Sequence, residues 1–243
     1  MFLSVVGGGS SQTPAALQTP ALPASPDPAL NVPAPAPLEP GSTSTWAPLR
    51  RAVLARDRPR PNAKVVARLE THTPEETSNI VVILGRRRDA SGRLWLHVRL
   101  PVLPNDLTGW IPRDALGGYS VVQTRLVVDL DRLTATLLRD RRPIFSARIG
   151  VGQQAWPTPR GQFYIRNRLT SYESPFYGPL AFGTSARSAV LTDWPAGGFV
   201  GIHGTNQPEL LPGRVSHGCI RMRNDDIVEL GRLMPIGTPV TIR

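Results

Sequence analysis

Cysteine occurs once in this 243-residue sequence, as Cys219, and two of the four histidines, His203 and His217, lie within 16 positions of it. A thiol is a strong nucleophile only as a thiolate, and a nearby imidazole can take its proton. Glycines adjoin all three residues. Glycine permits tight turns and lets a carbonyl substrate approach backbone amides closely. The spacing therefore predicts a Cys–His site for acyl transfer.

Two other interpretations of these residues stay open. A single cysteine is often a small buried apolar residue without chemistry. His203, His217 and Cys219 could also bind zinc, because three nitrogen and sulfur ligands plus water form an open catalytic site. Only one residue separates His217 from Cys219, which makes their convergence on a metal difficult. One cysteine excludes an intrachain disulfide and a multi-cysteine metal cluster.

The chain that must position these residues begins with a segment of unusual composition. Residues 1–44 hold nine of the 26 prolines and only two charged residues, Asp27 and Glu39. Such a Pro/Ala segment favours extended polyproline II and does not bury enough apolar surface to fold. We interpret it as a disordered tether, with a remnant of an export signal at 2–6, that could hold the chain at a membrane. An inert N-terminal tail is the alternative.

Residues 45–118 are typical of a small all-β domain. An apolar run at 80–84 and an alternating segment at 94–100 predict strands, with a turn signal between them. The order of motifs resembles bacterial SH3-like domains, with Trp95-Leu96-His97-Val98, then Gly109-Trp110-Ile111, then Asp114-Ala115-Leu116. The resemblance implies an SH3-like β-barrel that binds cell wall or acts as a spacer. A packing module without a ligand is the alternative.

Residues 119–243 also consist mostly of predicted strands. Short apolar or alternating segments predict strands at 126–130, 134–138, 143–150, 161–166 and 239–242. This regular spacing indicates a β-sandwich or barrel. One helix is predicted late in the chain, capped by Asn224 or Asp225 and continuing to Leu233 with apolar residues at helical spacing.

The long segment at 170–200 combines aromatic residues with proline and glycine. Acyl transfer requires that water be kept from the acyl-enzyme, and long loops often act as lids. We therefore predict a lid over the pocket. Its aromatic residues are Tyr172, Phe176, Tyr177, Phe182 and Trp194. An ordinary connection held by aromatic packing is the alternative.

The motifs around the cysteine are similar to those of the L,D-transpeptidase catalytic-domain family. The resemblance covers residues 119–243 and rests on Gly201-Ile202-His203-Gly204-Thr205 and Ser216-His217-Gly218-Cys219-Ile220-Arg221-Met222. It implies a β-sandwich-type catalytic domain of a bacterial cell-envelope enzyme. The fold expected for the whole chain is therefore mainly β, with an SH3-like β-barrel followed by an L,D-transpeptidase-type β-sandwich that carries one late helix.

The resemblance also assigns roles to residues of the motif. Cys219 stands at the position of the family's nucleophile, and His203 stands at the position of its general base. The backbone carbonyl of Gly204 would orient the His203 imidazole through its other ring nitrogen. His217 is expected to assist catalysis and to line the pocket. The backbone amides of Gly218 and Cys219, together with His217, are expected to form the oxyanion hole.

Three further residues are candidates for binding substrate. Arg221 stands where many family members have asparagine. Its guanidinium could hold a substrate carboxylate or form an ion pair with Asp225 or Asp226. Ser216 is expected to hydrogen-bond within its loop or to the substrate, and Thr205 is the third candidate.

The function that the resemblance implies is a peptidoglycan L,D-transpeptidase. Cys219 would take the acyl group of a donor stem peptide, release D-alanine and pass the acyl group to an acceptor stem peptide, giving a 3→3 cross-link. No cofactor or metal is expected, carbapenem β-lactams are expected to acylate Cys219, and the expected location is extracytoplasmic, in the periplasm or cell wall. The alternatives are an L,D-carboxypeptidase, a protein that attaches others to the wall, and a non-catalytic wall-binding protein.

The sequence carries 28 Lys and Arg residues against 18 Asp and Glu residues, a formal net charge of +10. This charge favours anionic partners such as wall polymers. Nucleic acid is not expected as a partner, because the arginine runs at 86–88 and 141–142 are short and no recognition helix or RNA-binding motif accompanies them. The sequence has no run of 18 or more apolar residues, so it predicts no membrane-spanning helix.

Overall fold

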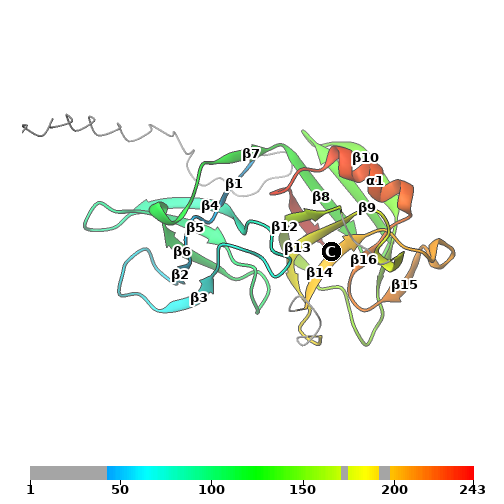
Figure 1. Cartoon of the computed structure of the whole chain (residues 1–243), viewed down its shortest axis with the longest axis horizontal. Helices are drawn as coiled ribbons and strands as arrows, with labels where there is room; N and C mark the ends of the chain where they lie inside the picture. The colour runs from blue at the N-terminus through cyan, green and yellow to red at the C-terminus, as the bar shows by residue number, and fades with distance from the viewer. Residues whose placement is uncertain (1–42, 171–174, 192–197) are drawn as a thin grey trace, which may run out of the picture. The chain divides into compact units, whose positions relative to one another are not determined.

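The structure is a computed structural model that describes residues 43–170, 175–191 and 198–243. These residues belong to one compact unit, and their strands form two sheets, coloured from blue to red along the chain in Figure 1. The mainly β fold with one late helix that we expected is confirmed for the described part of the chain. The predicted tether lies almost wholly outside the described residues.

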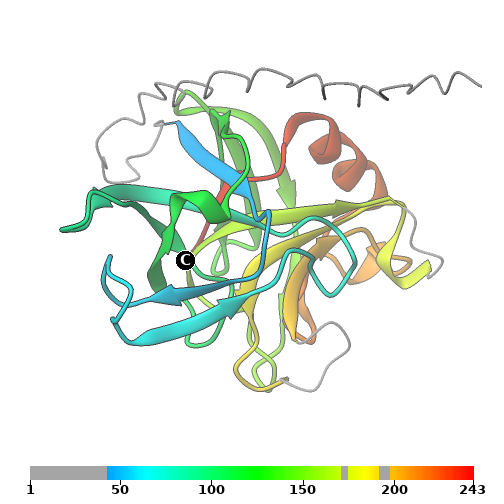
Figure 2. The same cartoon turned by 60° about the vertical axis from the view of Figure 1, so that its left-hand side comes forward.

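The first sheet has the strand order β3-β2-β6-β5-β4-β1-β7. Its strands are β1 (Ser44–Pro48), β2 (Val53–Arg56), β3 (Val65–Leu69), β4 (Ile80–Arg88), β5 (Leu94–Arg99), β6 (Thr108–Pro112) and β7 (Ser120–Val122). Figure 2 brings this sheet forward and shows that its strands twist and curl. The strands predicted at 80–84 and 94–100 are confirmed as parts of β4 and β5. An SH3-like barrel stays a prediction.

The turn between β4 and β5 depends on one aspartate. Asp89 Oδ1 accepts hydrogen bonds from the amides of Ser91 at 2.9 Å and Arg93 at 3.0 Å. Asp89 Oδ2 accepts a hydrogen bond of 2.8 Å from the indole of Trp95. Gly92 has a φ of +85°, a conformation that glycine adopts without strain. The predicted turn thus directs Trp95 into the core of the first sheet, where it is buried.

The second sheet has the strand order β10-β9-β8-β17-β12-β13-β14-β16-β11-β15. Its strands are β8 (Thr124–Asp129), β9 (Thr134–Arg139), β10 (Arg142–Arg148), β11 (Gly150–Gly152), β12 (Gly161–Leu169), β13 (Ala181–Arg187), β14 (Phe199–His203), β15 (Gly213–Ser216), β16 (Ile220–Arg221) and β17 (Pro239–Ile242). All five segments predicted as strands in this half are confirmed, and the segment at 143–150 contains the end of β10 and the start of β11.

The helix α1 (Asn224–Leu233) packs Ile227 and Leu230, both fully buried, into the core of the second sheet. The predicted cap is wrong, because the helix begins at Asn224 with Arg223 as N-cap and no side-chain cap hydrogen bond. Asn224 is used elsewhere, since its Oδ1 accepts a hydrogen bond of 2.9 Å from the Thr205 amide. Within the described ranges, no helix has the length and apolar character needed to cross a membrane.

The two sheets meet at the start of β4. The phenol of Tyr164, on β12, is fully buried and donates a hydrogen bond of 3.0 Å to the carbonyl of Ile80. Tyr164, Ile80 and Val82 form a small apolar cluster together with the partly buried Ile236. The chain passes from the first sheet to the second at Gln123, because β7 pairs with β1 and β8 pairs with β9.

The centre of the segment at 170–200 is a core strand of the second sheet, not a lid. Residues of β13 occupy the middle of the second sheet, and Phe182 is a buried core residue. The described part of the segment before β13 contains a short 3-10 turn at Pro175–Tyr177. Tyr172 and Trp194 lie outside the described residues. The lid prediction is therefore wrong for the residues of β13.

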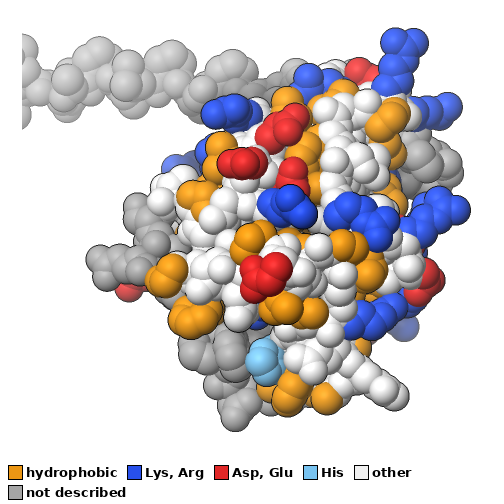
Figure 3. All heavy atoms as spheres, turned by 90° about the vertical axis from the view of Figure 1, so that its right-hand side faces the viewer, with side chains coloured by type: hydrophobic (Ala, Val, Ile, Leu, Met, Phe, Trp, Pro, Cys, Tyr) orange, Lys and Arg blue, Asp and Glu red, His pale blue; other side chains and the backbone are white. Residues whose placement is uncertain are grey.

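Surface charges of both signs are mixed. Figure 3 shows basic and acidic side chains side by side on the face that carries α1 and β15. Elsewhere Asp114 forms ion pairs with Arg51 at 2.6 Å and with Arg93 at 2.9 Å. Exposed pairs of this kind contribute little to stability. That the chain binds no nucleic acid stays a prediction.

Candidate active site

His203 and Cys219 lie at the ends of two neighbouring parallel strands, β14 and β16. His203 ends β14, and Cys219 directly precedes β16. Pairing sets Ile202 opposite Ile220, so Cys219 lies beside Gly201, whose amide donates a hydrogen bond of 3.4 Å to Cys219 Sγ. Alternate residues of a strand point to the same side, so Gly201 and His203 share a side of the sheet. The structure thus brings together the thiol and imidazole that the sequence paired.

Gly201 keeps the space between the thiol and the imidazole open. A Cβ atom added to Gly201 would lie 3.8 Å from Cys219 Sγ and 3.8 Å from His203 Cδ2. Sulfur and imidazole therefore approach one point from two sides. Sequence reasoning missed Gly201 as a site residue. Its place two residues before His203 on a strand was the available signal.

The His203 imidazole is held in one tautomer by the backbone. Nδ1 lies 2.6 Å from the carbonyl oxygen of Gly204. A carbonyl only accepts hydrogen bonds, so Nδ1 carries the proton and Nε2 is left to accept one. The side chain is buried, and burial lowers the pKa of His203 to about 4; the Arg221 charge acts in the same direction, and the Gly204 hydrogen bond opposes it. At neutral pH, His203 is an uncharged base.

The Cys219 thiol is also uncharged at rest. Burial raises its pKa, while the Gly201 amide and the Arg221 charge oppose this rise. A neutral thiol therefore faces a neutral imidazole. Cys219 as a whole residue is partly exposed.

The loop before Cys219 is fixed by hydroxyl groups on both sides. Ser216 Oγ donates to the Cys219 carbonyl at 2.6 Å and accepts from the Gly218 amide at 3.1 Å. Thr158 Oγ1 donates to the Gly218 carbonyl at 2.8 Å and accepts from the Gly152 amide at 2.9 Å. Gly218 has a φ of +114°, which other residues rarely adopt. Because the Gly218 amide is used within this loop, it is not aimed at an oxyanion in this structure.

The sulfur and the imidazole face a cavity of about 270 Å³. It is lined by Phe176, Tyr177, Ser188, Leu191, Gly198, Phe199, Val200, His203, Ser216, His217, Cys219 and Arg221. The Tyr177 ring meets the His203 ring edge-on, with 4.8 Å between centroids. The His217 ring packs against Trp156 at 4.3 Å. Apart from the aromatic residues expected in the lid, the apolar lining residues were not predicted from the sequence.

Arg221 lines the cavity and carries an unmatched donor. Its Nε atom is buried and has no hydrogen-bond partner among the described residues. The ion pairs of the described chain do not join Arg221 to Asp225 or Asp226, the structural partners considered from the sequence. A buried guanidinium donor that faces a cavity suits an anionic ligand group.

Thr205 does not line the cavity. Thr205 is buried outside the cavity lining, and its Oγ1 accepts a hydrogen bond of 3.1 Å from the Gln207 amide. Its contact with a substrate stays a prediction.

Over the described residues, no three His, Cys, Asp or Glu side chains converge to hold a metal ion. That the site needs no metal stays a prediction.

Comparisons with known proteins agree on one family. Residues 123–242 match the sequence model described as the YkuD L,D-transpeptidase catalytic domain. YkuD of Bacillus subtilis (strain 168) is 38% identical over 117 residues, which are 48% of this chain and 64% of that protein. YqjB of the same strain is 38% identical over 105 residues, 39% of this chain and 56% of that protein. The chain thus spans less than two thirds of either relative.

Two solved structures are similar to this chain over part of its length. The Ldtfm–avibactam carbamoyl enzyme is 29% identical, with a TM-score of 0.40, over 49% of this chain and 48% of that chain. The L,D-transpeptidase LdtMt1 in complex with imipenem is 16% identical, with a TM-score of 0.41, over 62% of this chain and 90% of that chain.

Proposed function

Because residues 123–242 belong to the L,D-transpeptidase catalytic-domain family, we propose that this chain joins peptidoglycan stem peptides through a thioacyl intermediate on Cys219. The product is a 3→3 cross-link, and D-alanine is released. The observation that carries the proposal is the shared cavity of the Cys219 thiol and a neutral His203 that Gly204 holds in the tautomer of a base. No step requires a metal or an organic cofactor.

The first half-reaction acylates the enzyme. The Cys219 sulfur attacks the carbonyl carbon of the third residue of a donor tetrapeptide, and the thiol proton passes to His203 Nε2. The carbon–nitrogen bond to the terminal D-alanine then breaks, and Nε2 returns that proton to the departing amine. A thioester and free D-alanine result, and His203 is neutral again.

The second half-reaction transfers the acyl group. The side-chain amine of an acceptor stem attacks the thioester carbon and gives a proton to His203 Nε2. The carbon–sulfur bond breaks, and the proton returns to the sulfur. A new amide joins the two stems, and the thiol is regenerated. Apolar walls from Phe176, Tyr177 and Phe199 favour an amine over water by limiting hydration of the thioester.

Two groups around the sulfur would recognise charge. We assign the oxyanion to the Cys219 amide, with His217 lining the same cavity, because the Gly218 amide is used by Ser216. We assign the carboxylate of the donor's D-alanine to Arg221, whose buried Nε has no partner among the described residues. The Ser216 hydroxyl makes contacts within its loop, so its role is to position Cys219.

The same thiol should react with carbapenem β-lactams. The sulfur would attack the strained lactam carbonyl, the ring carbon–nitrogen bond would open, and the ring nitrogen would take the proton that His203 received. The covalent adduct should add the mass of imipenem to the chain. Cys219→Ala should show no mass change.

The location and partners follow from the substrate. Peptidoglycan lies outside the cytoplasm, so we assign the chain to the cell envelope, where the Pro/Ala segment at 1–44 would act as a tether. The first sheet would act as a wall-binding or spacing unit. The net charge of +10 supports binding to anionic wall polymers.

Mass spectrometry of products formed from a purified disaccharide-tetrapeptide tests the proposal. The expected product is a cross-linked dimer that has lost one D-alanine, and Cys219→Ala should form none. Tripeptide without dimer would replace transfer by hydrolysis and identify a carboxypeptidase. Unchanged substrate with the wild-type chain would contradict both activities and favour a non-catalytic role in the wall.

A further inference from the structure

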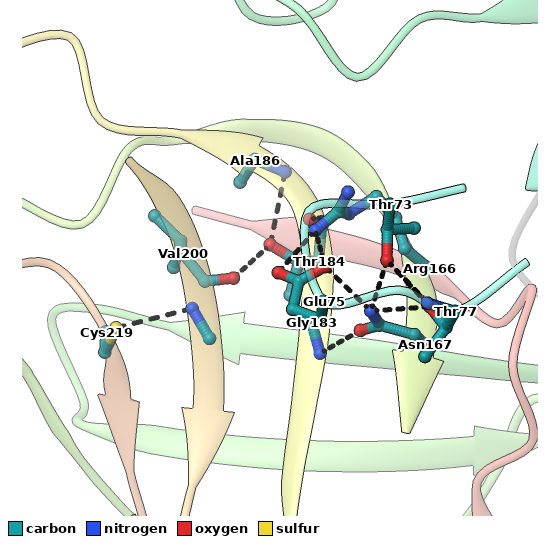
Figure 4. Close-up of polar contacts among 11 residues, drawn as sticks. Thr73, Glu75, Thr77, Arg166, Asn167, Gly183, Thr184, Ala186, Val200 and Cys219 are labelled. Atoms are coloured by element: carbon teal, nitrogen blue, oxygen red, sulfur yellow. Dashed lines mark hydrogen bonds and ion pairs between the residues drawn. The ribbon is translucent and has the colours of Figure 1, made fainter. Parts of the chain in front are cut away.

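The loop before β4 contacts β12 through the carboxylate of Glu75 and two threonine hydroxyls. Glu75 accepts hydrogen bonds from Arg166 Nη2 at 3.1 and 3.2 Å and from Asn167 Nδ2 at 3.1 Å. Thr73 and Thr77 of the same loop also accept from Asn167 Nδ2, at 3.4 and 3.0 Å. Figure 4 shows these three loop residues gathered around the two side chains of β12. The first half of the chain thus holds two polar residues of the second.

Arg166 depends on this carboxylate. The side chain is fully buried, and Glu75 is its ion-pair partner in the described chain. Burial lowers the pKa of Arg166, and the charge of Glu75 opposes that effect. Removal of one member of a buried ion pair leaves an uncompensated charge, which is strongly unfavourable. Arg166 therefore keeps its position because Glu75 is there.

Arg166 and Asn167 replace regular backbone pairing between β12 and β13. The pairing of these strands is irregular between Ile165 and Asn167. At that point Arg166 Nε donates to the Thr184 carbonyl at 3.0 Å, and Asn167 Oδ1 accepts from the Gly183 amide at 3.0 Å. The position of β13 here depends on two side chains that the loop before β4 holds.

Thr184 transmits this constraint to the peptide group beside the thiol. Its Oγ1 donates to the Val200 carbonyl at 2.6 Å and accepts from the Ala186 amide at 3.1 Å. The Val200 carbonyl and the Gly201 amide belong to one planar peptide group, and that amide donates to Cys219 Sγ at 3.4 Å. Fixing the oxygen of the group therefore fixes the direction of its N–H, and Figure 4 shows both contacts.

Arg166 supports the cavity in a second way. Its Cζ lies 3.6 Å from the centre of the Phe199 ring, a close cation–π contact. Phe199 lines the cavity beside Val200. The guanidinium thus holds one cavity wall directly while it holds β13 through Thr184.

We propose that Glu75 is a positioning residue for the Cys219 thiol, acting through Arg166 and Thr184 on the Val200–Gly201 peptide group. The first half of the chain thereby completes the reactive site of the second. Its effect on turnover rests on the proposed function, whereas its effect on the reactivity of the thiol does not.

The test follows alkylation of the single cysteine by iodoacetamide across a pH series, read by intact mass. Glu75→Gln removes the charge, and Glu76→Gln makes the same change at the exposed next position, which has no ion pair among the described residues. Thr184→Val removes the hydroxyl from the peptide group, and Thr184→Ser keeps it. Thermal unfolding of each variant establishes that it is folded.

The Gly201 amide lowers the pKa of the Cys219 thiol, so loss of its alignment should raise the midpoint of the pH profile. We expect Glu75→Gln and Thr184→Val to raise it by about 0.5–1 unit, which slows alkylation below the midpoint about 3- to 10-fold. Glu76→Gln and Thr184→Ser should keep the wild-type midpoint. A wild-type midpoint in folded Glu75→Gln, or in Thr184→Val, overturns the proposal.

Two further readouts keep the test decisive. If Glu75→Gln shows no cooperative unfolding, Thr184→Val decides the test, and an unshifted midpoint in that folded variant overturns the proposal. A shifted midpoint in a chain whose wild type makes no cross-linked dimer would overturn the proposed function and support this inference. If the wild type makes the cross-linked dimer and the variants keep the wild-type midpoint, the proposed function is supported and this inference is overturned.

Discussion

His203 is oriented by the residue that follows it, through a contact of 2.6 Å between its Nδ1 and the carbonyl oxygen of Gly204. Because the orienting group belongs to the backbone, no side-chain substitution removes it. The contact fixes which ring nitrogen carries the proton, and burial keeps the ring neutral. The protonation state of His203 therefore follows from the burial and the orientation of its ring.

The first prediction concerns stability against pH. The pKa of His203 is about 4 in the folded chain and 6.5 as its ordinary value. The unfolded chain binds the extra proton first, so folded-state stability falls as the pH falls from about 6.5 to about 4. The loss amounts to about 3 kcal/mol, or roughly 5–10 °C in melting temperature. His203→Gln should show a shallower fall between pH 7 and pH 4 by differential scanning calorimetry.

The control for this measurement is His72→Gln, which changes an exposed histidine of the first half. It should keep the wild-type dependence on pH. Equal slopes for wild type and His203→Gln would contradict the depressed pKa.

The second prediction concerns Gly201→Ala. The added methyl group would make ordinary contacts of 3.8 Å with both Cys219 Sγ and His203 Cδ2, so the fold should tolerate it. It would occupy the space that the proton and the substrate need. We expect kcat/KM to fall about 10- to 100-fold while the melting temperature stays within about 3 °C. Gly118→Ala, where nothing lies within 4 Å of the new atom, should change neither quantity.

The third prediction separates two roles of Ser216. Ser216→Ala removes the hydrogen bonds to the Cys219 carbonyl and from the Gly218 amide. If the hydroxyl positions the loop, kcat should fall about tenfold at unchanged KM, and stability should fall by about 1–3 kcal/mol. Ser146→Ala, at an exposed position of β10, is the matched change. An increase in KM at unchanged kcat would instead identify a substrate contact.

The fourth prediction concerns charge recognition by Arg221. Arg221→Gln should lower kcat/KM for a donor tetrapeptide about 10- to 100-fold, because a charge-assisted hydrogen bond to the D-alanine carboxylate is lost. A donor that ends in an amide should lose far less. Arg232→Gln makes the same charge change at an exposed position of α1 and should leave both donors unaffected. Equal losses for acid and amide donors would contradict the assignment.

Local patterns predicted many elements of this fold. Apolar or alternating segments located β8, β9, β10 and β12, and the apolar spacing of Ile227 and Leu230 located α1. The predicted cap failed because Asn224 bonds to the Thr205 amide, 19 positions earlier. The predicted lid failed at Phe182 because β13 pairs with strands on both sides and is a core strand. Both errors arise where a distant partner overrides a local preference.

The sequence by itself identified the candidate pair, because a lone cysteine and a glycine-flanked histidine at short spacing are the residue types that acyl transfer requires. Only the tertiary structure decided how that pair is held. The parallel pairing of β14 with β16 sets the Gly201 amide beside Cys219, and Glu75 contacts Arg166 across 91 positions of chain. Side-chain periodicity reports which face of a strand is buried. It does not report which strand lies alongside, since that choice depends on packing between segments far apart in the sequence.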